Sequence, residues 1–499
     1  MTCARIGLHL DGGQRRGGGA AVKTVALWLS LTSSGCFDPT KNDQAEGTGG
    51  SSGEGGSSMG DASGSVETTA TTASTATTAS TTMSTSATTS ATESADASAT
   101  ATDTVADSGS SEGSVPTCGD GNVDDGEECD DADDIDGNGC NNDCHVSGQV
   151  VWCVIDGDFD EDNGAGISAD NLGNVYATGT LFRQGIDEDV YIGSWTPDGT
   201  ERFRNLYDLS EGGYERGNDL VYYGSADDLF VTVAQDGFAR LVRVSTDGML
   251  ENDGAQSVTG ATFLEAHAIT VAPNGLYWAG FGSINGTSEF VVRRLSMFIA
   301  EQWTVHASQG PGNAPFYVGL VADPLDDVYL VGVSGPQGFI HHRSSVDGAL
   351  LDNATGLPQL TAIAVAGNGE LVVVGPSFVN GQGDNLTVTR RSADGNDEIW
   401  SVDFNGAANL DDRADGVAVD GDDRIVVAGS LADSDTSAQA FVARLDGDGA
   451  VLWQSAFSDE AGYYDVNDLV VDGTGAPSVV GSFFGQSGDG QIFVCHLTP

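Results

Sequence analysis

The chain of 499 residues carries 74 acidic and 19 basic side chains, for a net charge of −55. Such an acidic surface repels phosphate groups, which excludes nucleic acids and anionic lipid head groups as partners but is compatible with divalent cations and basic proteins. Composition changes sharply along the chain, and only about the last 350 residues are apolar enough to form a large core. No apolar run is long enough for a membrane-spanning helix.

The N-terminal segment has the layout of a secretory signal. Residues 20–36 read AAVKTVALWLSLTSSGC, in which Lys23 precedes an apolar core and small residues lead to Cys36. Its end, Ser33-Ser34-Gly35-Cys36, resembles the bacterial lipoprotein box, although Ser33 stands where that family usually has Leu. The resemblance implies a signal peptide over residues 1–36 and a lipid anchor on Cys36, and Phe37 in place of Asp favours the outer membrane. Ordinary cleavage, giving a secreted protein, is the alternative.

Residues 37–117 are predicted to be a disordered linker. This stretch consists mainly of Gly, Ser, Thr and Ala and includes the tract TTATTASTATTASTTMSTSATTSAT. Because almost nothing in it can be buried, the entropy cost of ordering it is not offset. A tether that holds the following domains away from an anchor is the simplest interpretation, and O-linked sugars on its threonines are an alternative.

Residues 118–147, CGDGNVDDGEECDDADDIDGNGCNNDCHVS, form a separate small module with four cysteines. The CGDG, EECDD and DGNGC motifs resemble the four-cysteine repeat of myxobacterial surface proteins, which implies two disulfides among Cys118, Cys129, Cys140 and Cys144. Three pairings are open. Zinc binding by these cysteines is less compatible with their spacing and an exported setting. Calcium is a possible ligand of the acidic loop, which contains Asp131, Asp133, Asp134 and Asp136.

A repeat recurs seven times over residues 148–499 and predicts an all-β fold, a seven-bladed β-propeller. Each copy has four short runs of alternating apolar and polar residues, separated by Asp-Gly turns, as in a small antiparallel sheet. Such a sheet has two apolar faces and must pack between neighbours. The copies begin at Ile167, Leu220, Ile269, Leu320, Ile363, Val417 and Leu469. The core AVDGDDRIVVAG followed by FVARLDGDG resembles the propeller-type repeats of bacterial secreted proteins.

The last copy lacks its fourth strand, which is predicted to come from the other end of the repeat region. GQVVWCVIDGDFD, from Gly148, aligns with GAVLWQSAFSDE, so that Trp152 falls where Trp453 does. The first strand should therefore complete the last sheet and close the ring. The alignment places Cys153 on Gln454 and Cys495 on Ala443, which face each other across a hairpin. A disulfide between Cys153 and Cys495 is therefore predicted, with two free buried thiols as the alternative.

Polar residues just before the innermost strands are predicted to meet at the mouth of the central channel. They are Asn218, His267, Tyr317, Thr361, Asp415 and Asn467. Such a ring could bind a sugar, a peptide or a cation, or be a solvated rim. No spaced metal motif is present, and the adjacent His341 and His342 must point to opposite faces of a strand. Neither a resident cofactor nor a metal ion is predicted for the propeller.

The sequence favours a binding function over catalysis. It contains no GxSxG motif, no phosphate-binding loop and no paired histidine and carboxylate motif for hydrolysis. The leading hypothesis is a monomeric lipoprotein that presents a propeller to a protein or glycan at the cell surface or outside the cell. An extracellular propeller hydrolase or lyase acting on polysaccharide, and a structural surface scaffold, are the alternatives.

Overall fold

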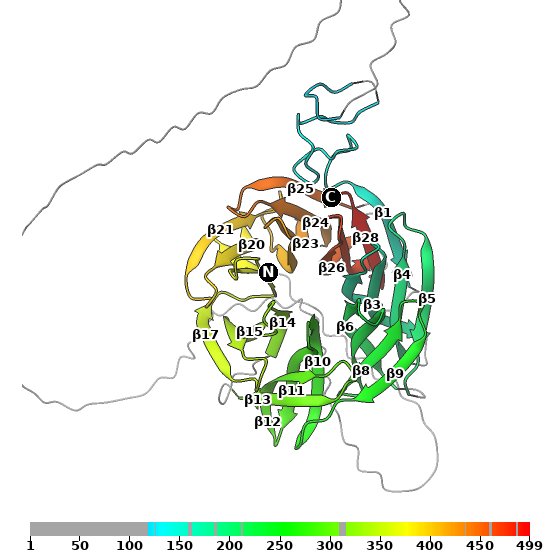
Figure 1. The fold of residues 1–499 in the computed structure, drawn as a ribbon, viewed down its shortest axis with the longest axis vertical. Coiled ribbons are helices and arrows are strands. Elements are labelled where there is room, and N and C mark those ends of the chain that lie inside the picture. Colours follow the sequence, from blue (N-terminus) through cyan, green and yellow to red (C-terminus); the bar gives the residue numbers. More distant parts are fainter. Residues whose placement is uncertain are drawn as a thin grey trace, which may run out of the picture. The chain divides into compact units, whose positions relative to one another are not determined.

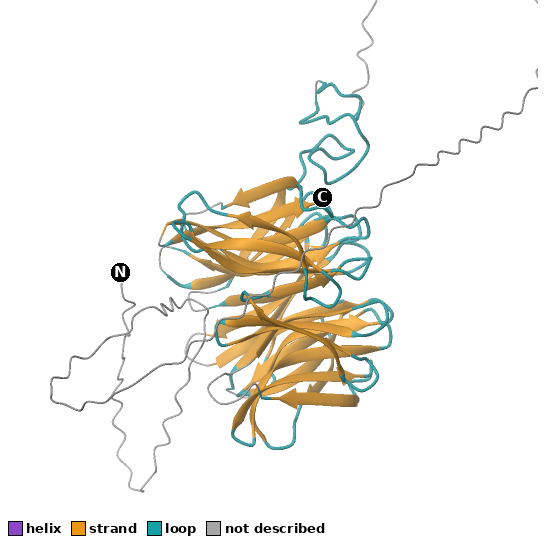
Figure 2. Cartoon of the chain, turned by 90° about the vertical axis from the view of Figure 1, so that its left-hand side faces the viewer, coloured by secondary structure: helices purple, strands orange, loops and turns teal. Residues whose placement is uncertain are grey.

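The computed structural model describes residues 118–499 apart from 125, 158–161, 184–186, 211–212, 309–315, 435, 459–461 and 486–487. Within these ranges the regular structure consists of 28 strands, and no helix that could cross a membrane is found there. Figure 2 shows the strands joined by loops. The expected signal peptide, the lipidation site Cys36 and the linker 37–117 lie outside the described residues.

The strands form four-stranded antiparallel groups that follow the chain. Five groups are separate sheets. They are β2 (Asn163–Ala169), β3 (Val175–Arg183), β4 (Asp187–Trp195) and β5 (Glu201–Tyr207); β6 (Glu215–Tyr223), β7 (Asp228–Gln235), β8 (Phe238–Ser245) and β9 (Leu250–Ala255); β10 (Ala261–Ala272), β11 (Gly275–Ile284), β12 (Thr287–Leu295) and β13 (Glu301–Ala307); β14 (Phe316–Ala322), β15 (Val328–Ser334), β16 (Gln337–Arg343) and β17 (Leu350–Leu357); and β18 (Ala362–Val365), β19 (Leu371–Val379), β20 (Gly383–Arg391) and β21 (Glu398–Phe404).

The other eight strands form one sheet with two halves. One half is β22 (Arg413–Val419), β23 (Ile425–Ser434), β24 (Ser437–Leu445) and β25 (Val451–Phe457), and the other is β26 (Tyr463–Val471), β27 (Pro477–Phe484), β28 (Gly490–Leu497) and β1 (Val150–Asp156). A single bridge pair, Ala438 with Tyr463, joins the halves. We call the second one the closing half, because β1 from the start of the repeat region pairs with β28 at its end.

The sheets form a β-propeller (Figure 1). The first strand of each sheet lies beside the first strands of its neighbours, and this inner circle is complete because β26 also contacts β2. The fourth strands form the outer edge and have the most exposed side chains, as in β5 and β25. The sequence prediction of repeated four-stranded sheets in an all-β propeller is therefore confirmed.

The core lies between successive sheets, because both faces of each sheet are apolar. On β7, Phe230 packs with Trp278 and Leu276 of the next sheet, whereas its neighbours Leu229 and Val231 pack with residues of the preceding sheet. Alternate side chains of one strand thus fill two different interfaces. Each sheet depends on both of its neighbours, which is why the repeats cannot fold singly.

A β-bulge in the first strand explains the glycine that usually ends the second strand. The pairing of first and second strands shifts between Ala414 and Gly416, for example, and Gly429 lies opposite Ala414. A Cβ atom on this glycine would lie 1.9 Å from the carbonyl oxygen of Arg413. The equivalent Cβ positions of Gly179, Gly280 and Gly481 lie 2.0 Å from a first-strand carbonyl oxygen, and that of Gly375 lies 2.1 Å from the carbonyl oxygen of Gln359, which precedes β18.

We expect Gly429→Ala to lower the free energy of unfolding by about 1–3 kcal/mol, because the added methyl group must displace the backbone of β22. Chemical denaturation followed by tryptophan fluorescence measures the loss. Gly421→Ala is the control, because nothing lies within 4 Å of a Cβ atom placed at Gly421. Equal stability of the two variants would contradict the steric explanation of the repeated glycine.

Tryptophans on three of the outer strands, Trp152, Trp303 and Trp400, hydrogen-bond to a turn of the next sheet. The indole N–H of Trp400 on β21 donates to the carbonyl oxygen of Gly447 at 3.0 Å, and Gly449 of the same turn has a φ of +86° and packs over the indole ring. Trp152 on β1 makes the corresponding bond to Pro197 at 3.0 Å. Trp152 therefore makes the same kind of contact as Trp400, as expected for a residue of an outer strand.

The cysteine-rich module lies beside the closing half. Its disulfides join Cys118 with Cys144 and Cys129 with Cys140, which settles the pairing that the sequence left open. The hydroxyl of Thr498 donates to the carbonyl oxygen of Val146 at 2.9 Å, and the Arg424 guanidinium donates to the carbonyl oxygen of Asp136. The module is thus joined to the propeller at the end of β28 and at the start of β23.

Candidate functional site

The inner strands carry the residues that the sequence predicts at the channel mouth. Asn218, His267, Asp415 and Asn467 each occupy the bulge of a first strand, at equivalent positions in four groups. Thr361 immediately precedes β18. Bulges turn a side chain out of the regular alternation and often occur beside functional sites.

Three of these polar residues bind the neighbouring strand. The amide of Asn218 donates to the carbonyl oxygen of Ala266, and that of Asn467 to the carbonyl oxygen of Gly164, both at 2.7 Å. The hydroxyl of Thr361 donates to the carbonyl oxygen of Ala414. Their hydrogen bonds join adjacent inner strands, so these side chains help to hold the ring together.

His267 and Asp415 have other surroundings. His267 stacks on Phe281, with ring centroids 5.3 Å apart, and its Nε2 lies 3.4 Å from a carboxylate oxygen of Glu265. Arg413 lies between Asp415, at 3.2 Å, and Asp465, at 2.8 Å. Burial raises the pKa of Asp415 to about 6, with Arg413 opposing the shift and Asp465 adding to it.

Tyr317 is not at the channel mouth, and this sequence prediction is wrong. Its side chain is buried between sheets, and its hydroxyl hydrogen-bonds to Nδ1 of His341 at 2.7 Å. The register of β14 shifts between Tyr317 and Gly319, so Val318 occupies the position that Asn218 and Asp415 occupy in their strands. Val318 stands two residues before Leu320, as Asn218 stands two before Leu220, whereas Tyr317 stands three residues before Leu320. Each step along a strand reverses the side-chain direction.

Sequence reasoning missed two carboxyl groups that follow the bulges, Asp219 and Asp468. Asp219 accepts the backbone N–H groups of Leu220 and Ile269, at 2.7 and 2.8 Å. Asp468 accepts those of Leu469 and Ile167, at 2.8 and 2.9 Å. Each carboxylate thus connects its own inner strand to the next one. Gly166 on the strand between them has no side chain, and a Cβ atom there would lie 2.7 Å from the Asp219 carboxylate.

Burial raises the pKa of both carboxyl groups, that of Asp468 to about 7. Repulsion from Asp468 raises the pKa of Asp219 further, while the backbone N–H donors act in the opposite direction. The two groups form a coupled acid pair on the inner strands that holds a proton near neutral pH.

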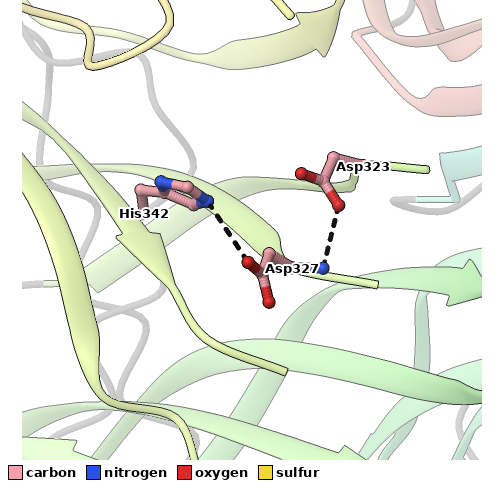
Figure 3. A group of neighbouring side chains, drawn as sticks. All are labelled: Asp323, Asp327 and His342. Carbon is pink, nitrogen blue, oxygen red and sulfur yellow. Dashed lines mark hydrogen bonds and ion pairs between the residues drawn. The ribbon is translucent and has the colours of Figure 1, made fainter. Parts of the chain in front are cut away.

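The sequence analysis also missed a group of possible metal ligands in the β14 sheet. Asp323 and Asp327 lie in the turn between β14 and β15, and His342 lies on β16 (Figure 3). One ligand-type atom from each lies within 4.8 Å of the others. The sequence signal was weak because the histidine comes from a different strand. His341, next to it, points the other way into the core, as its alternation with His342 predicts.

A second acidic group, Asp189, Asp208 and Glu215, also brings three carboxylates together. The guanidinium of Arg183 pairs with Asp189 at 2.5 Å, and the hydroxyl of Ser210 donates to Glu215. Arg183 thus supplies a positive charge within this group.

No family model and no curated protein matches the chain. Among solved structures, it is similar to the Dos1 propeller, with 7% identity over 70% of this chain and 95% of the other and a TM-score of 0.44. It is also similar to a protein of unknown function from Dyadobacter fermentans (9% identity, 70% and 99% coverage, TM-score 0.44) and to Drosophila Plexin A, solved in complex with Semaphorin 1b (11% identity, 70% and 87% coverage, TM-score 0.43). None of these similarities bears on the function of this chain.

Proposed function

We propose that the chain is a surface-displayed binding protein. In this proposal Cys36 carries a lipid anchor, residues 37–117 form the tether, and a seven-bladed propeller, closed by its N-terminal strand, presents one rim to a protein partner. The three disulfides fit an extracellular or otherwise oxidising environment. A glycan partner is the alternative, and a scaffold without a partner is a further one.

The observation that carries the proposal is a set of exposed apolar side chains at neighbouring turns. Phe298, Leu325 and Val346 are 86%, 79% and 83% exposed. They lie in the turns between β12 and β13, β14 and β15, and β16 and β17, respectively. We call these three side chains the apolar tips. Large apolar side chains at adjoining positions on a surface favour contact with another macromolecule.

Arg294 on β12 contacts the turns that carry two of the apolar tips, Leu325 and Val346. Its guanidinium donates to the carbonyl oxygen of Ser345, the residue before Val346, at 2.5 Å, and lies 3.5 Å from the carboxylate of Asp326, the residue after Leu325. Acidic side chains flank the tips, among them Asp323, Asp326, Asp327 and Asp347. A protein with apolar anchors surrounded by Lys or Arg would complement this surface.

The test replaces all three apolar tips with serine. The parent is first used to capture a protein partner from the exported proteins of the producing bacterium. We expect the variant to bind this partner at least tenfold more weakly, because each buried apolar anchor contributes about 1 kcal/mol or more. Surface plasmon resonance with the captured protein measures the change.

Phe378→Ser is the matched control for this experiment. Phe378 is 73% exposed and lies on β19 near the hairpin to β20, at the opposite end of the strands from the apolar tips. Its replacement should leave binding unchanged. Equal capture by the triple-serine variant and the parent would refute the proposed binding surface, and retention of polysaccharide in place of protein would favour the glycan alternative.

A further inference from the structure

Three side chains of the β14 sheet leave metal-binding atoms facing one another. The Oδ1 atom of Asp327 accepts the backbone N–H of Ser345 at 2.7 Å, and its Oδ2 lies 4.0 Å from Nε2 of His342. The Oδ1 atom of Asp323 accepts the backbone N–H groups of Leu325 and Asp327, at 2.8 and 2.9 Å. The turn between β14 and β15 therefore holds the Asp323 carboxylate, Ser345 of the turn after β16 holds that of Asp327, and each carboxylate keeps capacity for a cation (Figure 3).

His342 is oriented from the opposite side. Its Nδ1 lies 3.2 Å from a carboxylate oxygen of Asp352, and its ring stacks on Tyr329 with centroids 4.0 Å apart. A carboxylate only accepts hydrogen bonds, so Nδ1 carries a proton, and Nε2 is the ring nitrogen that remains to bind a cation. This Nε2 atom is buried and has no hydrogen-bond partner among the described residues. Carboxylate, histidine and metal in series are a common arrangement at metal sites.

In the β18 sheet the position equivalent to His342 is occupied by Arg390, whose positive charge the β14 sheet lacks at this position. Arg390 pairs with Val372 as His342 pairs with Tyr329, and Glu370 precedes β19 as Asp327 precedes β15. The Arg390 guanidinium binds Glu370 at 2.7 Å and Asp423 at 2.9 Å. In the β14 sheet histidine stands in place of this arginine, and the arginine that reaches the turn, Arg294 on β12, pairs with Asp326 between the two proposed ligands of that turn.

We propose that Asp323, Asp327 and His342 bind a divalent transition-metal ion, with Zn²⁺ as the preferred ion. The ion supplies the positive charge that Arg390 supplies in the β18 sheet. Two carboxylate oxygens and one imidazole nitrogen form a three-residue zinc ligand set, with water in the fourth position. Ca²⁺ and Mg²⁺ are disfavoured because they prefer sites made of oxygen alone.

The test is calorimetric titration of the full chain with ZnCl₂, together with the visible absorption of bound Co²⁺. We expect the parent to bind one Zn²⁺ ion and the His342→Arg variant to bind none. The new guanidinium would occupy the site, as that of Arg390 does in its own sheet. Asp352→Asn should weaken binding about 10–100-fold, because it removes the carboxylate that orients the imidazole. Thermal unfolding without metal verifies that both variants fold.

His306→Arg is the matched control. His306 also pairs with one carboxylate, that of Glu289 at 2.6 Å, but it does not belong to the three-residue group. Zinc binding should be unchanged in this variant. The proposal is overturned if the parent binds no Zn²⁺ at millimolar concentration, if His342→Arg binds as many ions as the parent, or if an equal concentration of Ca²⁺ displaces Zn²⁺.

Discussion

Replacing Cys153 and Cys495 with alanine is expected to lower the free energy of unfolding of the propeller by up to about 5 kcal/mol. The disulfide joins residues 342 positions apart, and their Cα atoms lie 4.2 Å from each other. In the chain-entropy model so long a loop restricts the unfolded chain strongly. Cys495 is also buried in the core of the closing half, so removal of its sulfur leaves less apolar contact there. Guanidinium titration under non-reducing conditions measures the loss.

Cys129→Ala with Cys140→Ala is the control pair. This disulfide spans 11 positions and lies within the cysteine-rich module. Its removal should leave the unfolding midpoint of the propeller close to that of the parent. If the Cys153 and Cys495 double variant unfolds at the parent's midpoint, the pairing of β1 with β28 closes the ring without covalent help. The predicted role of the disulfide would then be wrong.

The ring closure could be predicted from the sequence because strand pairing repeats from one hairpin to the next. In the complete copy Ala443 pairs with Gln454. Cys495 and Cys153 occupy the same positions in the closing half and pair with each other. Alternation and turn residues determine this register, so an alignment of repeats transfers it.

The candidate sites were less predictable, because they depend on where a bulge falls and on which turns meet. The prediction places Tyr317 at the bulge of its strand, but Tyr317 lies one residue before the bulge and its side chain is buried. The coupled Asp219 and Asp468 lie on β6 and β26, far apart in sequence. Asp323, Asp327 and His342 resemble the ordinary turn and strand residues of other copies until their side chains are placed in space.

The acid pair should make the propeller less stable as pH rises. Both carboxyl groups have raised pKa values in the fold, so the native state binds more protons than the unfolded chain above the ordinary Asp pKa. Their contribution to stability is therefore fully present in acid and is lost as pH rises through the folded pKa of about 7 for Asp468. Buried His341, whose pKa burial lowers to about 3, has the opposite effect over part of this range.

A comparison of the parent with Asp468→Asn isolates the pH effect of the acid pair from that of other titrating groups such as His341. We expect the variant to gain stability relative to the parent by roughly 2–3 kcal/mol between about pH 5 and about pH 8, because it has no carboxyl group to ionise at this position. In acid the variant should be the less stable of the two. Asp468 accepts the backbone N–H groups of Ile167 and Leu469, one on each oxygen, whereas the amide of Asn has a single oxygen and its N–H₂ group cannot accept the second hydrogen bond. Guanidinium titrations at both pH values measure the difference.

Asp394→Asn is the control for pH dependence. Hydrogen bonds from the side chains of Ser392 and Asn396 lower the pKa of Asp394 to about 2, so its charge does not change between about pH 5 and about pH 8. The stability difference between this variant and the parent should therefore be constant over the interval. Because Asp219 and Asp468 are coupled, the effects of Asp219→Asn and Asp468→Asn should also be non-additive at the higher pH. A pH-independent difference for Asp468→Asn would mean that its carboxyl group does not titrate over this interval, and that its pKa in the fold is not near 7.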